Sequence, residues 1–277
     1  MLRTMGAGLA PARRAVLAAA LLSGCADRGA SSPDLPRERR LLWEDDFTGR
    51  RGSFPDPVSW TAELGGGGWG NDELQEYTDA PANVALDGEG HLVITARRAV
   101  PGDDSTWTSA RITTFGKRTV VHGRVEVRAR IAAGQGVWPA VWMLGADIQQ
   151  VGWPACGEID VLEAFGDTRT ALHSLHAART DGSHWYTTSR SVRERPLADE
   201  FHVYAVDWTA AGARFEVDGE VTASVSREAL PPDVTWPFDG PQYLLLNVAV
   251  GGRLPGYPDA GTPDSVSTVV DRVRVYG

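Results

Sequence analysis

Cysteine is almost absent from this chain, whose 277 residues include only Cys25 and Cys156. A fold held together by a framework of disulfides is therefore excluded. Helical periodicity is also missing, because no stretch after residue 40 repeats apolar residues at helical spacing over three turns. Acidic residues outnumber basic ones, and the formal net charge of −9 argues against a nucleic-acid partner.

The chain also lacks a hydrophobic run long enough to span a bilayer. A short apolar run at residues 15–22 follows three arginines and ends in Leu22-Ser23-Gly24-Cys25, which resembles a bacterial lipobox. We expect residues 1–24 to be a lipoprotein signal peptide and Cys25 to be lipidated as the mature N-terminus. An ordinary secretory signal is the alternative. Residues 25–40 show no apolar periodicity and are expected to form a flexible tether.

Residues 41–277 are predicted to form one all-β domain. Short apolar stretches alternate with turns rich in Gly, Pro and Asp, such as Asp218-Gly219. Residues 123–131 show the regular alternation of a half-buried antiparallel strand. A dozen or so such strands without an internal repeat predict a two-sheet β-sandwich.

One predicted strand carries an unusual set of acids. Glu158, Asp160 and Glu163 lie among apolar residues, which is not the composition of a solvated acidic run. A regular strand places Glu158 and Asp160 on one face and Glu163 on the other. A β-bulge near Val161 and Leu162 would return Glu163 to the first face. All three acids would then line one surface of the sheet.

Such a row of acids has a chemical use. Retaining glycoside hydrolases need two carboxyl groups about 5–5.5 Å apart, and strand curvature narrows the spacing of the two glutamates. The alternative is an edge strand whose carboxylates only face solvent. Cys156 lies beside these acids, and its apolar neighbours indicate a buried structural thiol rather than a nucleophile.

Other strands place aromatic and polar residues where a saccharide could bind. All ten tryptophans follow residue 42, and Trp138 and Trp142 share one face of a predicted strand. Asn247 interrupts an apolar strand, so it is either buried with a partner or directed into a cleft. His173 and His176 are three positions apart, so only one of them can face the acids in a regular strand.

The last predicted strand contains a second misplaced acid. We expect Asp271 to share a face with Val269, Val273 and Val275, and a carboxylate in an apolar row requires a partner. Calcium would satisfy it, because Ca²⁺ prefers oxygen ligands. A salt bridge to arginine is the alternative.

Several of these stretches resemble the family 16 glycoside hydrolases, and most of all the bacterial laminarinases, which are endo-1,3-β-glucanases. They occur in the order found in that family and span nearly all of residues 41–277. The stretches are GNDELQ (70–75), TSARI (108–112), GVWPAVWMLG (136–145), WPACGEIDVLE (153–163), LNVAVGG (246–252) and VDRVRVY (270–276).

The resemblance implies a β-jelly roll with a concave substrate cleft. It implies that Glu158 is the nucleophile, Glu163 the general acid/base and Asp160 the residue that assists between them. Seven residues match sugar-binding positions: Asn71, Arg111, Trp138, Trp142, Trp153, His176 and Asn247. Core packing is the alternative for Trp142, and a structural role for His176. Asp271 matches the ligand of a structural calcium ion, completed by backbone oxygens near Asp46 and Gly90.

The expected activity is retaining endo-hydrolysis of 1,3-β-glucan by double displacement, with no cofactor for catalysis. Another β-linked polysaccharide, such as mixed-linkage glucan or galactan, or transglycosylation, is the alternative within the same mechanism. A non-catalytic glucan-binding protein is the alternative of another class. We expect a monomer that is held by its lipid to a bacterial cell envelope and faces the periplasm or the exterior.

Overall fold

The computed structural model describes residues 39–100, 102–103 and 105–277. The predicted signal peptide, the lipidation site Cys25 and nearly all of the predicted tether lie outside these residues. Within the described ranges, no helix is both long and apolar enough to cross a membrane. The only helical elements in them are α1 (Ile148–Val151) and the 3-10 turn η1 (Arg227–Ala229), in agreement with the missing helical periodicity.

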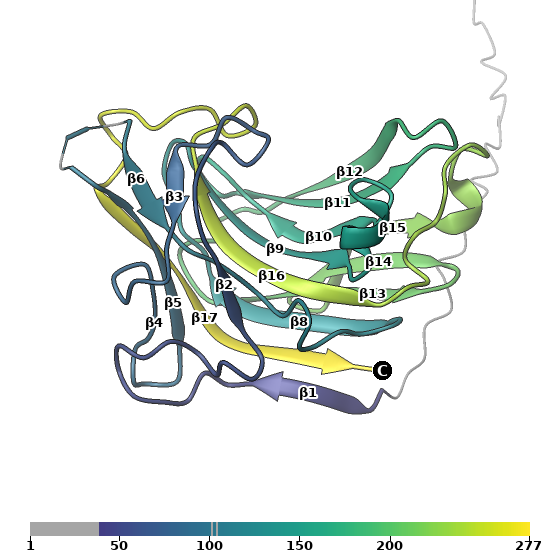
Figure 1. Cartoon of the computed structure of the whole chain (residues 1–277), viewed down its shortest axis with the longest axis horizontal. Helices are drawn as coiled ribbons and strands as arrows, with labels where there is room; N and C mark the ends of the chain where they lie inside the picture. Colours follow the sequence, from purple (N-terminus) through teal and green to yellow (C-terminus); the bar gives the residue numbers. More distant parts are fainter. Residues whose placement is uncertain (1–38, 101, 104) are drawn as a thin grey trace, which may run out of the picture. The chain divides into compact units, whose positions relative to one another are not determined.

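The domain is a sandwich of two largely antiparallel sheets (Figure 1). The ten-stranded sheet has the order β15-β14-β13-β8-β17-β5-β6-β3, with β1 added to β17 and β4 to β5. Its strands are β1 (Leu41–Asp45), β3 (Gln75–Tyr77), β4 (Val84–Leu86), β5 (Leu92–Arg98), β6 (Trp107–Ser109), β8 (Gly123–Arg130), β13 (His202–Thr209), β14 (Gly212–Val217), β15 (Glu220–Ser226) and β17 (Ser265–Tyr276).

The seven-stranded sheet has the order β12-β11-β10-β9-β16-β7-β2 and carries the three acids. Its outer face is concave in Figure 1. The strands are β2 (Thr61–Glu63), β7 (Arg111–Thr113), β9 (Val137–Gly145), β10 (Glu158–Glu163), β11 (Thr170–Ala178), β12 (His184–Val192) and β16 (Gln242–Val250). The predicted two-sheet architecture is therefore confirmed, with more and shorter strands than the sequence indicated.

The core lies between the sheets. It is formed by the apolar residues that alternate with polar residues along each strand. In β8, Val125, Val127 and Ala129 are buried and the intervening residues are partly exposed, as predicted. Across the interface, Ile159 and Val161 of β10 belong to the same apolar cluster. Full burial of one such side chain contributes roughly 1.5–3 kcal/mol, so this interface fixes which face of β10 points outward.

Strand β10 contains the predicted bulge. Its pairing with β9 shifts between Asp160 and Leu162, and its pairing with β11 shifts between Asp160 and Glu163. Val161 and Leu162 are consecutive, yet both are buried in the core. The extra residue therefore resets the alternation, and Glu163 returns to the outer face with Glu158 and Asp160.

A second bulge, in β17, corrects one prediction. The pairing of β17 with β8 shifts between Val270 and Arg272. The buried row therefore changes from Thr268 and Val270 to Val273 and Val275. Asp271 lies at the change and is partly exposed, so it does not share a face with the buried Val273 and Val275 as expected.

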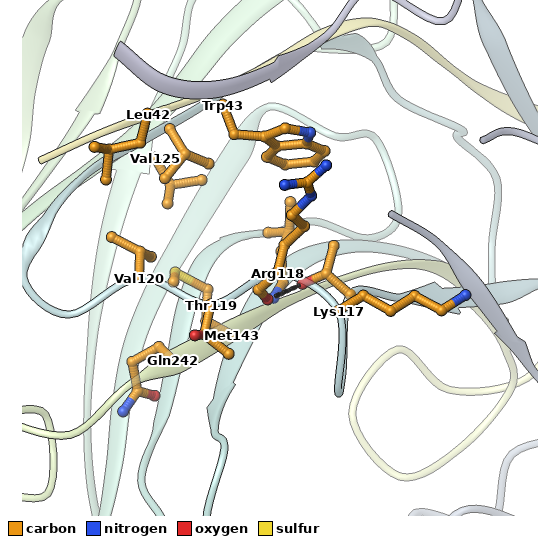
Figure 2. A pocket seen from close by; sticks show the side chains of 12 residues that line it. Leu42, Trp43, Lys117, Arg118, Thr119, Val120, Val125, Met143 and Gln242 are labelled. Carbon is orange, nitrogen blue, oxygen red and sulfur yellow. Dashed lines mark hydrogen bonds between the residues drawn. The ribbon is translucent and has the colours of Figure 1, made fainter. Parts of the chain in front are cut away.

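A cavity of about 280 Å³ lies between the sheets, beneath β1 (Figure 2). Both sheets and the connection from β7 to β8 contribute to its walls, and none of the three acids does. The lining residues are Leu42, Trp43, Thr114, Lys117, Arg118, Thr119, Val120, Val125, Met143, Gln242, Leu244 and Val275.

Candidate active site

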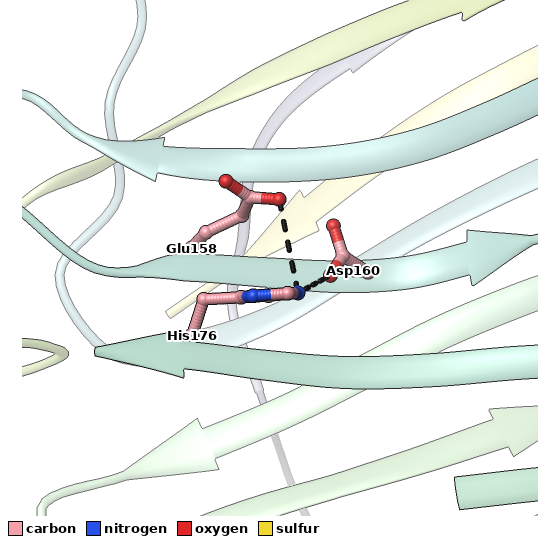
Figure 3. A group of neighbouring side chains, drawn as sticks. All are labelled: Glu158, Asp160 and His176. Carbon is pink, nitrogen blue, oxygen red and sulfur yellow. Dashed lines mark ion pairs between the residues drawn. The ribbon is translucent and has the colours of Figure 1, made fainter. Parts of the chain in front are cut away.

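The three acids of β10 lie on the outer face of the seven-stranded sheet. Asp160 is 2% exposed, whereas Glu158 and Glu163 are partly exposed. His176 is the Cα partner of Glu158 on the neighbouring strand β11. Figure 3 shows its ring directed at both carboxylates, with Nε2 3.0 Å from Asp160 Oδ2 and 4.0 Å from Glu158 Oε1.

Each glutamate accepts a hydrogen bond from one tryptophan. The Trp153 Nε1–H donates to Glu158 Oε2 at 2.7 Å, from the loop before β10. The Trp138 Nε1–H donates to Glu163 Oε1 at 2.9 Å, from the start of β9. The two indoles therefore orient the two carboxyl groups, and Trp138 and Trp153 lie at the acids as expected.

Burial shifts the protonation of all three acids. It raises the pKa of Glu158 to about 8, and the charge of Asp160 adds to this effect. Burial also raises the pKa of Asp160. For Glu163, burial and then the charges of Asp160 and Glu158 raise the pKa well above its usual range. A cluster of carboxyl groups with raised pKa values retains protons near neutral pH, as general acid catalysis requires.

Glu158, Asp160 and His176 are also close enough to hold a metal ion, because one ligand atom from each lies within 4.8 Å of the others. The contact between His176 and Asp160 accounts for part of this proximity without an ion. His173, three residues earlier, is buried 5.2 Å from the Phe215 ring, and its Nδ1 is 2.7 Å from the Val161 carbonyl. Only one of the two histidines therefore faces the acids, as predicted.

A second polar group lies on the same sheet, across β9, β16 and β7. The Arg111 guanidinium is 4.8 Å from the centre of the Trp69 ring and 4.6 Å from the centre of the Trp142 ring. It also pairs with Glu63. Arg111 thus lies between two indoles and keeps them at a fixed separation. Each cation–π contact of this kind stabilises the arrangement by roughly 0.5–2 kcal/mol.

Asn247 has two protein partners, so the first of its two predicted alternatives is correct. Its side-chain oxygen accepts a hydrogen bond from Trp142 at 2.7 Å, and its amide nitrogen donates to the Tyr77 hydroxyl at 3.0 Å. Asn71 lies in the loop before β3, where it donates a hydrogen bond to Glu73 at 3.1 Å. Burial raises the pKa of Glu73.

Residues 71–268 match the family model of glycosyl hydrolases family 16. The chain belongs to this family. It is therefore a glycoside hydrolase, and its two sheets form the jelly roll that the resemblance implied.

Relatives of this family 16 hydrolase cover most of its length. A beta-glucanase from Rhodothermus marinus is 39% identical over 276 residues, which cover 95% of this chain and 94% of that protein. A glucan endo-1,3-beta-glucosidase from Cryptopygus antarcticus is 37% identical over 227 residues, which cover 78% of this chain and 82% of that protein. The laminarinase catalytic domain from Thermotoga maritima, in complex with cetyltrimethylammonium bromide, has a TM-score of 0.77 at 38% identity, covering 86% of this chain and 98% of that chain.

The structure of the family 16 domain adds residues that the sequence analysis missed. His184 and Tyr186 of β12 lie beside His176, with ring centroids 5.1 and 5.6 Å away. Both are exposed on the same face as the acids. The alternation in His184-Trp185-Tyr186 could have indicated this, because it places the outer two residues on one face of a strand.

Cys156 has the structural role expected of it. The thiol is 1% exposed and packs in a small apolar cluster with Leu144, Tyr243 and Leu245. Burial raises its pKa to about 11. A thiol that remains protonated at neutral pH is a poor nucleophile.

Proposed function

We propose that this chain is a retaining endo-1,3-β-glucanase in which Glu158 is the nucleophile and Glu163 the general acid/base. The observation that carries the proposal is the bulge in β10, which brings both glutamates to one face of the sheet. The Cryptopygus antarcticus and Thermotoga maritima relatives, named as a 1,3-β-glucosidase and a laminarinase, support the choice of substrate.

The reaction proceeds in two displacements. Glu163 gives its proton to the glycosidic oxygen as that bond breaks, while the Glu158 carboxylate forms a bond to the anomeric carbon. Glu163, now ionised, then removes a proton from water. The resulting oxygen attacks the same carbon and releases Glu158 as a carboxylate. Carboxyl groups and water are sufficient for these steps, so no cofactor is required.

The electrostatics favour this division of roles. Glu163 has two acidic neighbours that raise its pKa, so the cluster retains a proton there. Glu158 has one such neighbour, Asp160. Each glutamate also accepts one indole hydrogen bond, so the number of acidic neighbours is what distinguishes the two. Asp160 lies between them and keeps His176 directed at Glu158. Two carboxyl groups in different environments are the usual arrangement in retaining enzymes.

The tryptophans provide apolar faces for sugar rings. Trp153 is 50% exposed beside the nucleophile, and Trp138 is bound to the general acid. Trp142 and Arg111 lie farther along the same face, so a chain crossing the sheet would meet all of them. This arrangement suits internal cleavage of a polymer. Another β-linked glucan or a galactan remains the alternative substrate, and transglycosylation the alternative outcome.

The test is product analysis on laminarin, lichenan and agarose, with the anomeric configuration followed by NMR. We expect release of oligosaccharides from laminarin with retention of the β-configuration. Glu158→Gln and Glu163→Gln should each lower the rate roughly 1,000-fold or more. The exposed Glu228→Gln is the matched control. Inversion, or wild-type rates in both active-site variants, would refute the mechanism, and binding to curdlan without products would favour the non-catalytic alternative.

We also propose that Cys25 is lipidated and that the enzyme is anchored to a bacterial cell envelope. The support is the lipobox-like sequence that ends at Cys25. Partitioning of the full-length protein into detergent should be lost in Cys25→Ala. Equal partitioning of both proteins would contradict anchoring through this residue.

A structural calcium ion is the last element of the proposal. The Asp46 carbonyl lies 3.8 Å from where a side chain at Gly90 would begin, and the next residue, His91, is 3.9 Å from Asp271. Asp46 is thus beside Gly90, the His91 ring is near Asp271, and the oxygens of the three expected positions would suit Ca²⁺. The Asp271 carboxylate, however, already pairs with Arg128 and Arg272, each at 3.0 Å. An ion would have to compete with these arginines.

Thermal unfolding in calcium and in EGTA tests this site. Binding to the folded state alone raises the melting temperature. We expect calcium to raise it in the wild type and to have no effect in Asp271→Asn. The absence of a calcium effect in the wild type would leave the arginine pairs as the role of Asp271.

A further inference from the structure

His184 forms a direct contact with His176, the histidine that faces the acids. His184 Nε2 lies 2.8 Å from His176 Nδ1, a hydrogen-bond distance. The two residues are on adjacent strands, where Ala178 is the Cα partner of His184 and Tyr186 that of His176. The rings therefore meet diagonally across β11 and β12, on the outer face of the sheet.

The two imidazoles lie nearly in one plane. Their planes differ by 7°, and their centroids are 5.1 Å apart. Rings stacked face to face would not bring two nitrogens to 2.8 Å at this centroid separation. An edge-to-edge arrangement does so, and it directs a ring N–H of one imidazole at the lone pair of the other.

The contact connects the acids to the edge of the sheet. Asp160 lies 3.0 Å from His176 Nε2, and His184 lies at Nδ1 on the opposite side of the same ring. A neutral imidazole has one donor and one acceptor nitrogen. When Nε2 carries the proton beside the Asp160 carboxylate, Nδ1 must accept, and His184 Nε2–H is the donor in position. The hydrogen bond at one nitrogen thus determines the proton at the other.

We propose that His184 is a positioning residue, which holds His176 as its Nε2–H tautomer, with that proton on the side of the ring that faces the Asp160 and Glu158 carboxylates. This inference rests on the proposed function, in which Asp160 and His176 support the nucleophile Glu158. Without the His184 donor, the Nδ1–H tautomer becomes accessible, and its bare Nε2 would face the Asp160 carboxylate. Loss of the correct tautomer is known to be costly where a carboxylate orients a catalytic histidine.

The same geometry limits the charge of the pair. Two imidazolium rings cannot share a hydrogen bond, because neither has an acceptor nitrogen. The pair therefore carries at most one additional proton while the contact persists. The charged and titratable groups that surround it are Asp160, Glu158 and Glu163 on β10 and Tyr186 on β12.

Two variants separate a hydrogen-bond role from a packing role. His184→Phe retains a flat ring beside Trp153, whose centroid is 4.6 Å away, but it has no N–H. His184→Gln loses the ring but retains an N–H donor. We expect kcat on laminarin to fall about tenfold in His184→Phe with little change in KM, and to fall less in His184→Gln. His202→Phe, at a histidine that pairs with Asp218 on the other sheet, is the control.

Each other outcome contradicts the proposal. An unchanged kcat in His184→Phe would show that the donor is not needed. A change in KM alone, largest in His184→Gln, would make His184 a surface for sugar rings. Equal losses in both variants, together with a lower melting temperature, would show a structural role.

A spectroscopic measurement tests the tautomer without substrate. The ¹⁵N chemical shifts of the imidazole nitrogens distinguish Nε2–H from Nδ1–H. We expect His176 to be Nε2–H in the wild type and a mixture of tautomers in His184→Phe. A single unchanged tautomer in both proteins would overturn the proposal. Because this readout needs no activity, failure to cleave laminarin would refute the proposed function and leave this inference testable.

Discussion

At the scale of single residues, each of the two glutamates has its own tryptophan partner. Each accepts one indole N–H, Glu158 from Trp153 and Glu163 from Trp138. A hydrogen bond to the ionised form of a carboxyl group lowers its pKa. Each tryptophan therefore opposes the upward shift that burial produces, and each does so for a different glutamate.

Replacement of each indole by phenylalanine should move one limb of the pH profile of kcat/KM. Trp153→Phe should raise the pKa of Glu158. Because Glu158 must be ionised, the acidic limb of the profile should shift to higher pH by about one unit. Trp138→Phe raises the pKa of Glu163, which must be protonated, so the alkaline limb should move up instead. The measurement is kcat/KM on laminarin across pH, which reports groups of the free enzyme.

The two variants act as controls for each other. A general loss of packing would lower the rate at every pH and would move neither limb. Movement of the same limb in both variants would contradict the assignment of separate roles to Glu158 and Glu163.

The sequence predicted the acids more accurately than their partners. Glu158, Asp160 and Glu163 are close in the chain, so spacing and the period of a strand were enough to place them. Arg111 is expected to bind sugar hydroxyls, but its position between Trp69 and Trp142, which come from distant segments, was not predicted. Contacts between distant segments depend on the order of strands in the sheet, which local periodicity does not determine.

At the scale of elements, the two bulges differ in how well they could be foreseen. In β10 the positions of the acids indicate which face of the strand is polar. A bulge is needed to bring Glu163 to the same face as Glu158 and Asp160. In β17 valines occur on both faces near Asp271, so either register buries apolar residues. The alternation alone then gives no sign of a shift, and the predicted face of Asp271 was wrong for that reason.

The outer face of the ten-stranded sheet carries an ion-pair network centred on Asp207 of β13. This residue is 2% exposed and pairs with Arg39, Arg124 and Arg214 from three other segments. Removal of its carboxylate would leave several guanidinium groups with less negative charge nearby to balance their positive charge. We expect Asp207→Ala to lower the free energy of unfolding by roughly 3–5 kcal/mol, measured by urea denaturation.

The control for this prediction is Glu220→Ala. Glu220 pairs with Arg193 at 2.7 Å, but its side chain is 71% exposed. Exposed pairs of this kind contribute about 0–1 kcal/mol. Equal destabilisation by the two substitutions would show that burial of the network around Asp207 does not matter.

At the scale of the whole molecule, the buried acids make stability depend on pH. Burial raises the folded-state pKa of Glu158 from 4.5 to about 8. A group whose pKa is higher in the folded state favours folding while both states are protonated. This contribution is complete below about 4.5 and is lost as the pH rises through about 8.

Burial also raises the pKa of Glu163 well above its usual range, so Glu163→Gln should be more stable than the wild type at pH values above the ordinary range of a carboxyl group. The amide retains the shape of the carboxyl group but cannot ionise, so it avoids the cost of charge in the cluster. We expect the free energy of unfolding to increase by roughly 1–3 kcal/mol at high pH and hardly at all at low pH. The melting temperature of both proteins, measured across pH, reports this difference. A gain that is the same at every pH would show that charge is not its cause.

All three acids belong to one continuous strand, and this has a consequence for motion. Any displacement of one sheet relative to the other would move β10 together with the sheet to which it is hydrogen-bonded. The separations among Glu158, Asp160 and Glu163 are then preserved, since they are set by bonds within six residues. A site assembled from both sheets would lose its alignment in the same fluctuation. The spacing of the reacting groups is therefore set within one strand and does not depend on how the two sheets are docked.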